Sequence, residues 1–149
     1  QASVRHALRA APTSVDIALV HDAVRPFVDA SDVRNVIRAV RRHGAASLAM
    51  PVADTLRRGT DDVLGETVPR DDLYRMQTPQ GFRREWLEEA HRAAAEGEER
   101  PATDDVGLVQ RQGHDVHLVQ GRRSNFKITT TADWELAQQV WAAGSDASS

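Results

Sequence analysis

Hydrophobic residues along the chain occur first as short unbroken runs and then at helical spacing. Residues 17–20 form a continuous apolar run, which is typical of a strand buried on both faces of a parallel sheet. Apolar residues within 33–40 recur at helical spacing behind Ser31, a good N-cap residue, and Gly44 ends this predicted helix. A second apolar run follows at 45–52. The stretch therefore predicts a strand, a helix and a strand joined by a right-handed parallel crossover.

The pattern changes between about residues 54 and 75. Two short strand-like segments there flank a turn-prone sequence, Gly59-Thr60-Asp61-Asp62. They predict a β-hairpin that is set off from the main sheet. Because the hairpin has too few large apolar residues to be stable alone, we expect it to need a partner surface.

The remaining chain predicts three more helices and two short strands. Helices are expected at 86–94, behind Thr103 as a cap, and behind Thr130, where Thr-x-x-Asp has the pattern of a capping box. Strands are expected at 116–119 and 126–129. Strands that alternate with helices indicate an α/β protein. We predict a Rossmann-like, mostly parallel sheet sandwiched by helices, with the hairpin as a protruding arm.

Composition excludes several classes of function. The 149 residues are about one domain's worth, and 19 basic against 22 acidic residues give a net charge of −3, too balanced for a protein that binds nucleic acid non-specifically. The absence of cysteine excludes disulfides, thiolate nucleophiles and cysteine-ligated metals. No apolar stretch approaches the roughly 20 residues that cross a bilayer. We expect a cytoplasmic protein with neither nucleic acid nor membrane as a partner.

The two ends of the chain lead to a prediction about domain organisation. The first residue is Gln1, within a pattern that reads as a helix, and residues 144–149 are small and polar. We therefore expect a piece of a longer gene product, with one domain portion over residues 1–143. Residues 144–149 are predicted to form a flexible tail or the start of a linker.

Candidate chemistry follows the apolar runs, because ligands of open α/β sheets bind beyond the carboxyl ends of the strands. Asp22 and Arg25 follow the first run, where a carboxylate can hold a cation or a sugar hydroxyl and a guanidinium can grip a phosphate; on spacing alone, a purely structural pair is equally supported. Thr55 follows the second run and either bonds a phosphate oxygen or merely caps the turn. Lys127 is one of the few cations that the pattern does not place on a helix exterior.

Two more segments have unusual composition. Arg70 follows a Val-Pro pair, and residues 78–82 combine proline, glycine and polar side chains, which favours a functional loop over a rigid elbow. The glycines form neither a Walker A loop nor a G-x-G-x-x-G pattern, so we expect no self-contained nucleotide cradle. His114 and His117 are interpreted as surface histidines and not as a metal pair.

Six short motifs, spread over most of the chain, match one protein family in their order and spacing. They are His21-Asp22-Ala23-Val24-Arg25-Pro26-Phe27, Pro51-x-x-Asp54-Thr55, Arg70, Gln77-Thr78-Pro79-Gln80-Gly81-Phe82, Thr103-Asp104-Asp105 and Asn125-Phe126-Lys127-Ile128-Thr129. Taken together, they resemble the 2-C-methyl-D-erythritol 4-phosphate cytidylyltransferase family of the non-mevalonate isoprenoid pathway. One such motif would be a weak signal, whereas six in register are a strong one.

The resemblance implies a nucleotidyltransferase. An oxygen of the sugar phosphate attacks the α-phosphorus of CTP, pyrophosphate leaves, and the reaction depends on positioning and charge neutralisation, with Mg²⁺ as the implied cofactor. Lys127 would face the transferring phosphate, and Arg70 is the second implied catalytic residue. Ser3 and Ala23 would lie beside the nucleotide.

The resemblance also implies an acceptor site shared between two subunits. Residues implied to bind the acceptor are Asp22, Arg25, Thr55, Thr78 and Thr103. Asp22 is in addition the implied metal ligand. The arm would clasp a second subunit in a homodimer, so that Thr55 and Arg70 complete the partner's site. This agrees with the separate expectation that the arm cannot bury itself.

One departure from the family pattern limits the expected activity. Family members begin with a strand and a glycine-rich loop that holds the CTP triphosphate, and residues 1–149 contain no counterpart. We therefore expect the N-terminal part of the fold to be absent and residues 1–149 alone to be inactive.

Other functions remain open from the residues. A pentitol-phosphate cytidylyltransferase shares the motifs at 21–27 and 125–129, although the sequence of residues 68–82 favours the erythritol enzyme. A non-catalytic dimerisation module is the alternative outside enzymes, and a fusion to a following cyclase domain is a third arrangement.

Overall fold

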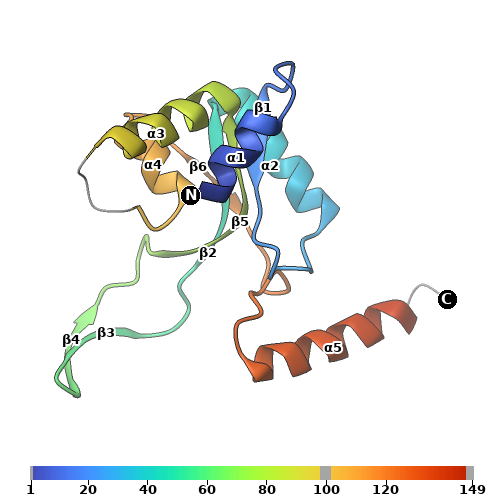
Figure 1. The fold of residues 1–149 in the computed structure, drawn as a ribbon. Coiled ribbons are helices and arrows are strands. Elements are labelled where there is room, and N and C mark those ends of the chain that lie inside the picture. The colour runs from blue at the N-terminus through green and yellow to red at the C-terminus, as the bar shows by residue number, and fades with distance from the viewer. Residues whose placement is uncertain (1, 98–101, 147–149) are drawn as a thin grey trace.

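The structure is a computed structural model that describes residues 2–97 and 102–146. Its first four elements are α1 (Ala2–Ala10), β1 (Ile17–Val20), α2 (Ala30–His43) and β2 (Ala45–Pro51). The hairpin strands β3 (Leu56–Thr60) and β4 (Val63–Val68) follow. The remaining elements are β5 (Tyr74–Arg83), α3 (Arg84–Glu96), α4 (Asp105–Arg111), β6 (His117–Gln120) and α5 (Thr131–Asp146) (Figure 1).

The main sheet has the strand order β1-β5-β2-β6. β6 pairs parallel with β2, whereas β5 pairs antiparallel with both β1 and β2. Strands β1, β2 and β6 thus share one direction, and the α/β class is confirmed. The sheet is nevertheless mixed, because β5 lies between β1 and β2. The strands at either end of α2 run parallel, as predicted, although they are not direct neighbours in the sheet.

Strand β5 contains the segment that was predicted as a loop. Pro and Gly are disfavoured in strand interiors, so residues 78–82 resemble a loop in sequence. The pairing of β2 with β5 is irregular between Ser47 and Ala49, close to Pro79, which has no N–H to donate. Gly81 is required by packing, because a Cβ there would lie 2.8 Å from side-chain atoms of Leu19, Val36 and Val40.

Two helix starts differ from the expected caps. Asp29 is the N-cap of α2, and its side chain accepts a hydrogen bond from the Ser31 backbone N–H, so the expected cap Ser31 lies inside the helix. Asp104, not Thr103, caps α4 and accepts from the backbone N–H of Gly107. The predicted end of α2 is correct, because Gly44 has a φ of +92° and donates to the carbonyl of Val40.

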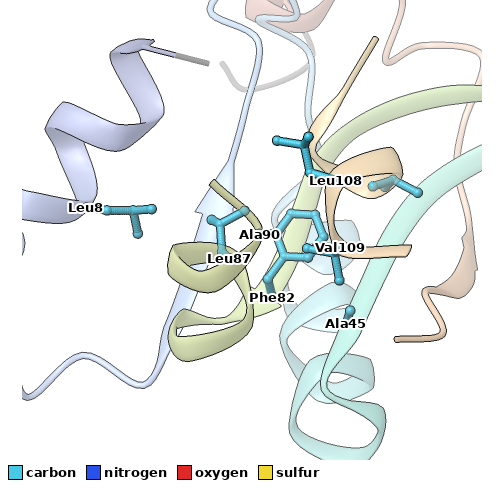
Figure 2. Close-up of a cluster of buried hydrophobic side chains, with 8 residues drawn as sticks. Leu8, Ala45, Phe82, Leu87, Ala90, Leu108 and Val109 are labelled. Atoms are coloured by element: carbon cyan, nitrogen blue, oxygen red, sulfur yellow. The ribbon is translucent and has the colours of Figure 1, made fainter. Parts of the chain in front are cut away.

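The hydrophobic core has one cluster on each face of the sheet. The larger cluster lies among the sheet, α1, α3 and α4 (Figure 2) and contains Leu8, Ala45, Phe82, Leu87, Ala90, Val106, Leu108 and Val109. The smaller cluster, under α2, contains Val36, Val40, Ala46 and Leu48. Neighbouring residues Ala45 and Ala46 belong to opposite clusters, as the alternation of side chains along a strand requires. The sheet is therefore covered by helices on both faces.

The hairpin β3–β4 stands away from the main sheet, as the sequence pattern predicts (Figure 1). Its tip exposes Val63 and Leu64, whose relative exposures are 67% and 77%. Because the described residues leave these side chains largely uncovered, the hairpin does not bury an apolar face of its own.

The chain after β6 also leads away from the sheet. The predicted strand at 126–129 is wrong: this segment is an extended loop in which the Ile128 N–H donates to the Val24 carbonyl. The predicted capping box is correct, since the Thr130 N–H donates to Asp133 Oδ2 at 2.8 Å and the Asp133 N–H donates to Thr130 Oγ1 at 3.1 Å. Helix α5 continues to Asp146, beyond the expected start of the tail at residue 144, and residues 147–149 lie outside the described part.

No helix in the described ranges 2–97 and 102–146 has both the length and the apolar character needed to span a membrane.

Candidate functional site

Asp22 lies in the loop after β1, between two cationic side chains. Its Oδ2 is 3.0 Å from Lys127 Nζ and 3.6 Å from Arg25 Nε. The Asp22–Arg25 pair that spacing alone allowed is therefore present, but it is part of a triad that includes a residue more than 100 positions away in sequence. The Lys127 side chain is 44% exposed and that of Asp22 37%, so both can also reach a ligand.

Arg25 is held more tightly than Lys127. Its Nη1 donates to the Asn125 carbonyl at 2.8 Å and its Nη2 to the Met76 carbonyl at 3.4 Å, and its side chain is only 12% exposed. The guanidinium thus ties the loop after β1 to β5 and to the loop that carries Lys127. Arg25 acts as a fixed positive charge and Lys127 as the adjustable one.

Thr78 enters the site from β5. Its Oγ1 accepts a hydrogen bond from the Asp22 backbone N–H at 3.0 Å and lies 2.9 Å from Nδ1 of His21. The Asn125 side chain, fully buried, donates from Nδ2 to the Thr78 carbonyl at 2.8 Å. These contacts join three separate segments of the chain around Thr78.

The loop that carries Lys127 is anchored on two sides. Gln77 Nε2 donates to the carbonyl of Arg122 at 2.9 Å and to that of Asn125 at 3.3 Å. On the other side, Arg122 Nε lies 3.1 Å from Oδ1 of the buried Asp32 in α2. The backbone just before Lys127 is therefore fixed to the sheet and to a helix.

A cavity of about 360 Å³ lies at the carboxyl end of β1. Five of the residues predicted from the sequence line it: Asp22, Arg25, Thr78, Thr103 and Lys127. An adjoining cavity of about 540 Å³ shares Arg25 and Lys127 and reaches Asp54 at the base of the hairpin. Residues from four of the six motifs thus line the same cavity.

Four predicted residues lie outside this lining. Thr55 and Arg70 are exposed at the base of the hairpin, where an Arg70 Nη1 donates to the Ala53 carbonyl. Ser3 and Ala23 are exposed beside the lining residues Val4 and Asp22. The structure of a single chain brings none of these four side chains into the cavity.

The other two carboxylates of the cavity have partners within the fold. Asp104 accepts from the Gly107 N–H through Oδ1 and from Gln80 Nε2 through Oδ2, each at 3.0 Å. Asp105 Oδ1 is 2.7 Å from Nε2 of the buried His91. Asp22 is thus the carboxylate that faces the two cations. Within residues 2–97 and 102–146, no group of three or more His, Cys, Asp or Glu side chains has the arrangement of a metal site.

The roles of His21 and Asn125 are not apparent from the sequence. Both lie inside quoted motifs, but their contacts reach residues 57 and 47 positions away, so no local spacing signals them. In the structure, Asn125 is recognisable because it is a fully buried asparagine in a loop, and buried polar side chains are normally hydrogen-bonded.

The fold and the cavity define an α/β protein that presents cations, a carboxylate and hydroxyl groups at the carboxyl ends of its strands. Such a surface suits a phosphorylated ligand that also carries hydroxyl groups. The family model described as 2-C-methyl-D-erythritol 4-phosphate cytidylyltransferase (IspD) matches residues 1–142, and the chain belongs to this family. The resemblance drawn from the six motifs is confirmed.

Individual relatives agree with this assignment. A protein of Salinibacter ruber named 2-C-methyl-D-erythritol 4-phosphate cytidylyltransferase is 65% identical over 99% of this chain and 61% of its own length. A protein of Deinococcus radiodurans with the same name is 49% identical over 94% of this chain and 59% of its own length. The chain therefore spans about three-fifths of these curated relatives. The crystal structure of the enzyme so named from Thermus thermophilus matches with a TM-score of 0.86 at 43% identity, over 95% of this chain and 68% of that one.

Proposed function

We propose that this chain supplies the acceptor-binding part of a cytidylyltransferase that transfers CMP from CTP to 2-C-methyl-D-erythritol 4-phosphate. The observation that carries the proposal is the convergence of Asp22, Arg25, Thr78 and Lys127 on one cavity. The relative that is 65% identical bears the name of this activity. The products are 4-diphosphocytidyl-2-C-methyl-D-erythritol and pyrophosphate.

The proposed reaction forms one P–O bond and breaks another. A phosphate oxygen of the acceptor bonds to the α-phosphorus of CTP, and the bond from that phosphorus to the oxygen bridging to the β-phosphate breaks, so that pyrophosphate leaves with the electron pair. Such transfers need positioning and charge neutralisation more than covalent participation by the protein. Lys127 supports this role, because its partly exposed ammonium can leave Asp22 for a phosphate oxygen. Arg25 keeps a second positive charge in a fixed place.

The nucleotide is proposed to approach from the side of α1. Ser3 is exposed next to Val4, and Ala23 is exposed next to Asp22, and both of these neighbours line the cavity. With small side chains at both positions, the base and ribose can come close to the backbone. Thr103, which also lines the cavity, is proposed to contact the acceptor.

Mg²⁺ is proposed to bind through Asp22 together with phosphate oxygens of the substrates. Mg²⁺ is commonly held by one or two carboxylates and substrate phosphates, so a single protein carboxylate fits such a site, and the described residues contain no larger ligand cluster. When bound, the ion would neutralise negative charge on the phosphates. We expect Asp22→Asn to raise the Mg²⁺ concentration needed for half-maximal rate, and an unchanged requirement would refute this ligand.

The hairpin is proposed to clasp a second copy of the chain in a homodimer. Its tip exposes Val63 and Leu64, and Thr55 and Arg70 at its base lie outside the cavity of their own chain. In a dimer, these two side chains would complete the partner's acceptor site. Replacing Val63 and Leu64 by serine should shift the sedimentation coefficient towards that of a monomer. Retention of the dimer would refute the clasp.

The activity is tested with Lys127→Ala in the natural gene product that carries this chain. We expect the rate with CTP and the erythritol phosphate to fall by about a hundredfold or more, as for the removal of one charge-stabilising donor. Arg34→Ala, which removes an exposed charge from α2, is the matched control and should leave the rate unchanged. A near-normal rate for Lys127→Ala would remove this residue from the chemistry. Faster turnover of a pentitol phosphate would identify the other acceptor.

A further inference from the structure

His21 connects a carbonyl group, which can only accept a hydrogen bond, with a hydroxyl group, which can donate or accept. Its Nε2 lies 3.0 Å from the backbone carbonyl oxygen of Arg25, and its Nδ1 lies 2.9 Å from Oγ1 of Thr78. A carbonyl oxygen can only accept a hydrogen bond, so Nε2 must carry the proton. In the neutral imidazole, Nδ1 is then the acceptor.

The tautomer of His21 determines the direction of the Thr78 hydroxyl. With the neutral ring, Nδ1 accepts, and the hydrogen on Thr78 Oγ1 therefore points at His21. The same oxygen already accepts the Asp22 backbone N–H at 3.0 Å. A hydroxyl group has one hydrogen and two lone pairs, so a single lone pair remains for a ligand. With its hydrogen committed, Thr78 meets a ligand only as an acceptor.

We propose that His21 is a positioning residue that fixes Thr78 as a hydrogen-bond acceptor and thereby sets the orientation of the acceptor substrate. A hydroxyl group of the polyol can donate to Thr78, whereas a phosphate oxygen, which has no hydrogen to give, cannot. The phosphate is left to Lys127, whose ammonium is a donor without acceptor capacity. This inference rests on the proposed function, because it assigns the two ends of the same polyol phosphate within the same cavity.

The tautomer is tested by ¹⁵N NMR of the histidine rings in the complete gene product, with the His21 signals assigned by their loss in His21→Gln. We expect a neutral ring protonated at Nε2. We also expect the Nδ1 resonance to move towards that of a free acceptor nitrogen in Thr78→Val. A ring protonated at Nδ1, or an Nδ1 resonance that does not respond to Thr78→Val, would overturn the proposal. This measurement does not depend on catalysis.

The effect on the substrate is tested by steady-state kinetics with His21→Leu and His21→Asn. His21→Leu releases the Thr78 hydroxyl, so we expect KM for the polyol phosphate to rise about tenfold, a size consistent with one lost hydrogen bond, with kcat and KM for CTP nearly unchanged. His21→Asn keeps an acceptor near the position of Nδ1 and should recover most of the affinity. Thr78→Val should raise KM to a similar extent, and adding His21→Leu to it should have no further effect.

The two proposals fail in distinguishable ways. An unaltered KM for the polyol phosphate in His21→Leu, or an equal rise in KM for CTP, would refute the role of His21 while the activity itself stands. Absence of turnover by the unsubstituted protein would refute the proposed function, and the NMR measurement would still decide whether Thr78 is held as an acceptor.

Discussion

Replacing Asn125 should both destabilise the protein and slow the proposed reaction, because this side chain holds the loop of Lys127 against the sheet. Asn125 is fully buried, and its Nδ2 donates to the Thr78 carbonyl at 2.8 Å. Its backbone carbonyl in turn accepts from Arg25 Nη1 at 2.8 Å. Lys127 follows only two residues later, so a shift of Asn125 is transmitted directly to the ammonium.

The size of the effect follows from these contacts. Asn125→Ala leaves the Thr78 carbonyl without its side-chain donor in a buried site, which costs about 1–3 kcal/mol. Incomplete collapse of the space left by the amide group adds to this, for a total of roughly 2–4 kcal/mol. Asn125→Asp removes the donor and buries an unpaired carboxylate, so its cost should be higher, about 3–5 kcal/mol. A displacement of Lys127 by about 1 Å is enough for a rate loss of up to about a hundredfold.

Urea unfolding followed by circular dichroism measures the first effect, and initial rates with CTP and the erythritol phosphate measure the second. Ser124→Ala is the matched control, because Ser124 is the exposed neighbour in the same loop, and it should change the free energy of unfolding by less than about 0.5 kcal/mol. If Asn125→Ala were as stable and as active as Ser124→Ala, the anchoring role of the buried amide would be wrong.

Two further predictions concern stability at the opposite end of the sheet. Gly44→Ala should lower Tm much more than Gly113→Ala: both glycines have positive φ (+92° and +82°), but only at Gly44 would the Cβ collide with the Trp86 ring, at 2.1 Å, so equal losses would refute the packing argument. Partial desolvation, and then the nearby His117, lower the pKa of His43 from its ordinary 6.5. As pH falls through 6.5, the unfolded state therefore takes up this proton first and stability decreases. Urea midpoints between pH 7.5 and 5.5 should fall less in His43→Gln, and parallel curves would contradict the shift.

Local features of the chain were sufficient to predict most helices and strands. Helix ends such as Gly44 and the capping box at Thr130 depend on residues within four positions of each other, so their signals survive in sequence. Asp22 was also recognisable, because polar residues that follow apolar runs emerge where strands end. Lys127 was recognisable for another reason, since it is one of the few cations that the pattern does not place on a helix exterior. Their direct 3.0 Å contact was not, since it depends on two loops meeting.

Only the tertiary structure decided that β5 lies between β1 and β2, and several contacts of the site depend on this strand order. The segment 78–82 has the composition of a loop, and only packing against Leu19, Val36 and Val40 explains a glycine in the middle of a central strand. Once β5 lies between β1 and β2, Thr78 meets the loop after β1. The sequence alone therefore determined the individual helices and strands and the chemical groups that the site can use, because these depend on residues close together in sequence. The strand order, the direction of the Thr78 hydroxyl and the anchoring by Asn125 depend on contacts between distant segments, which no local period records.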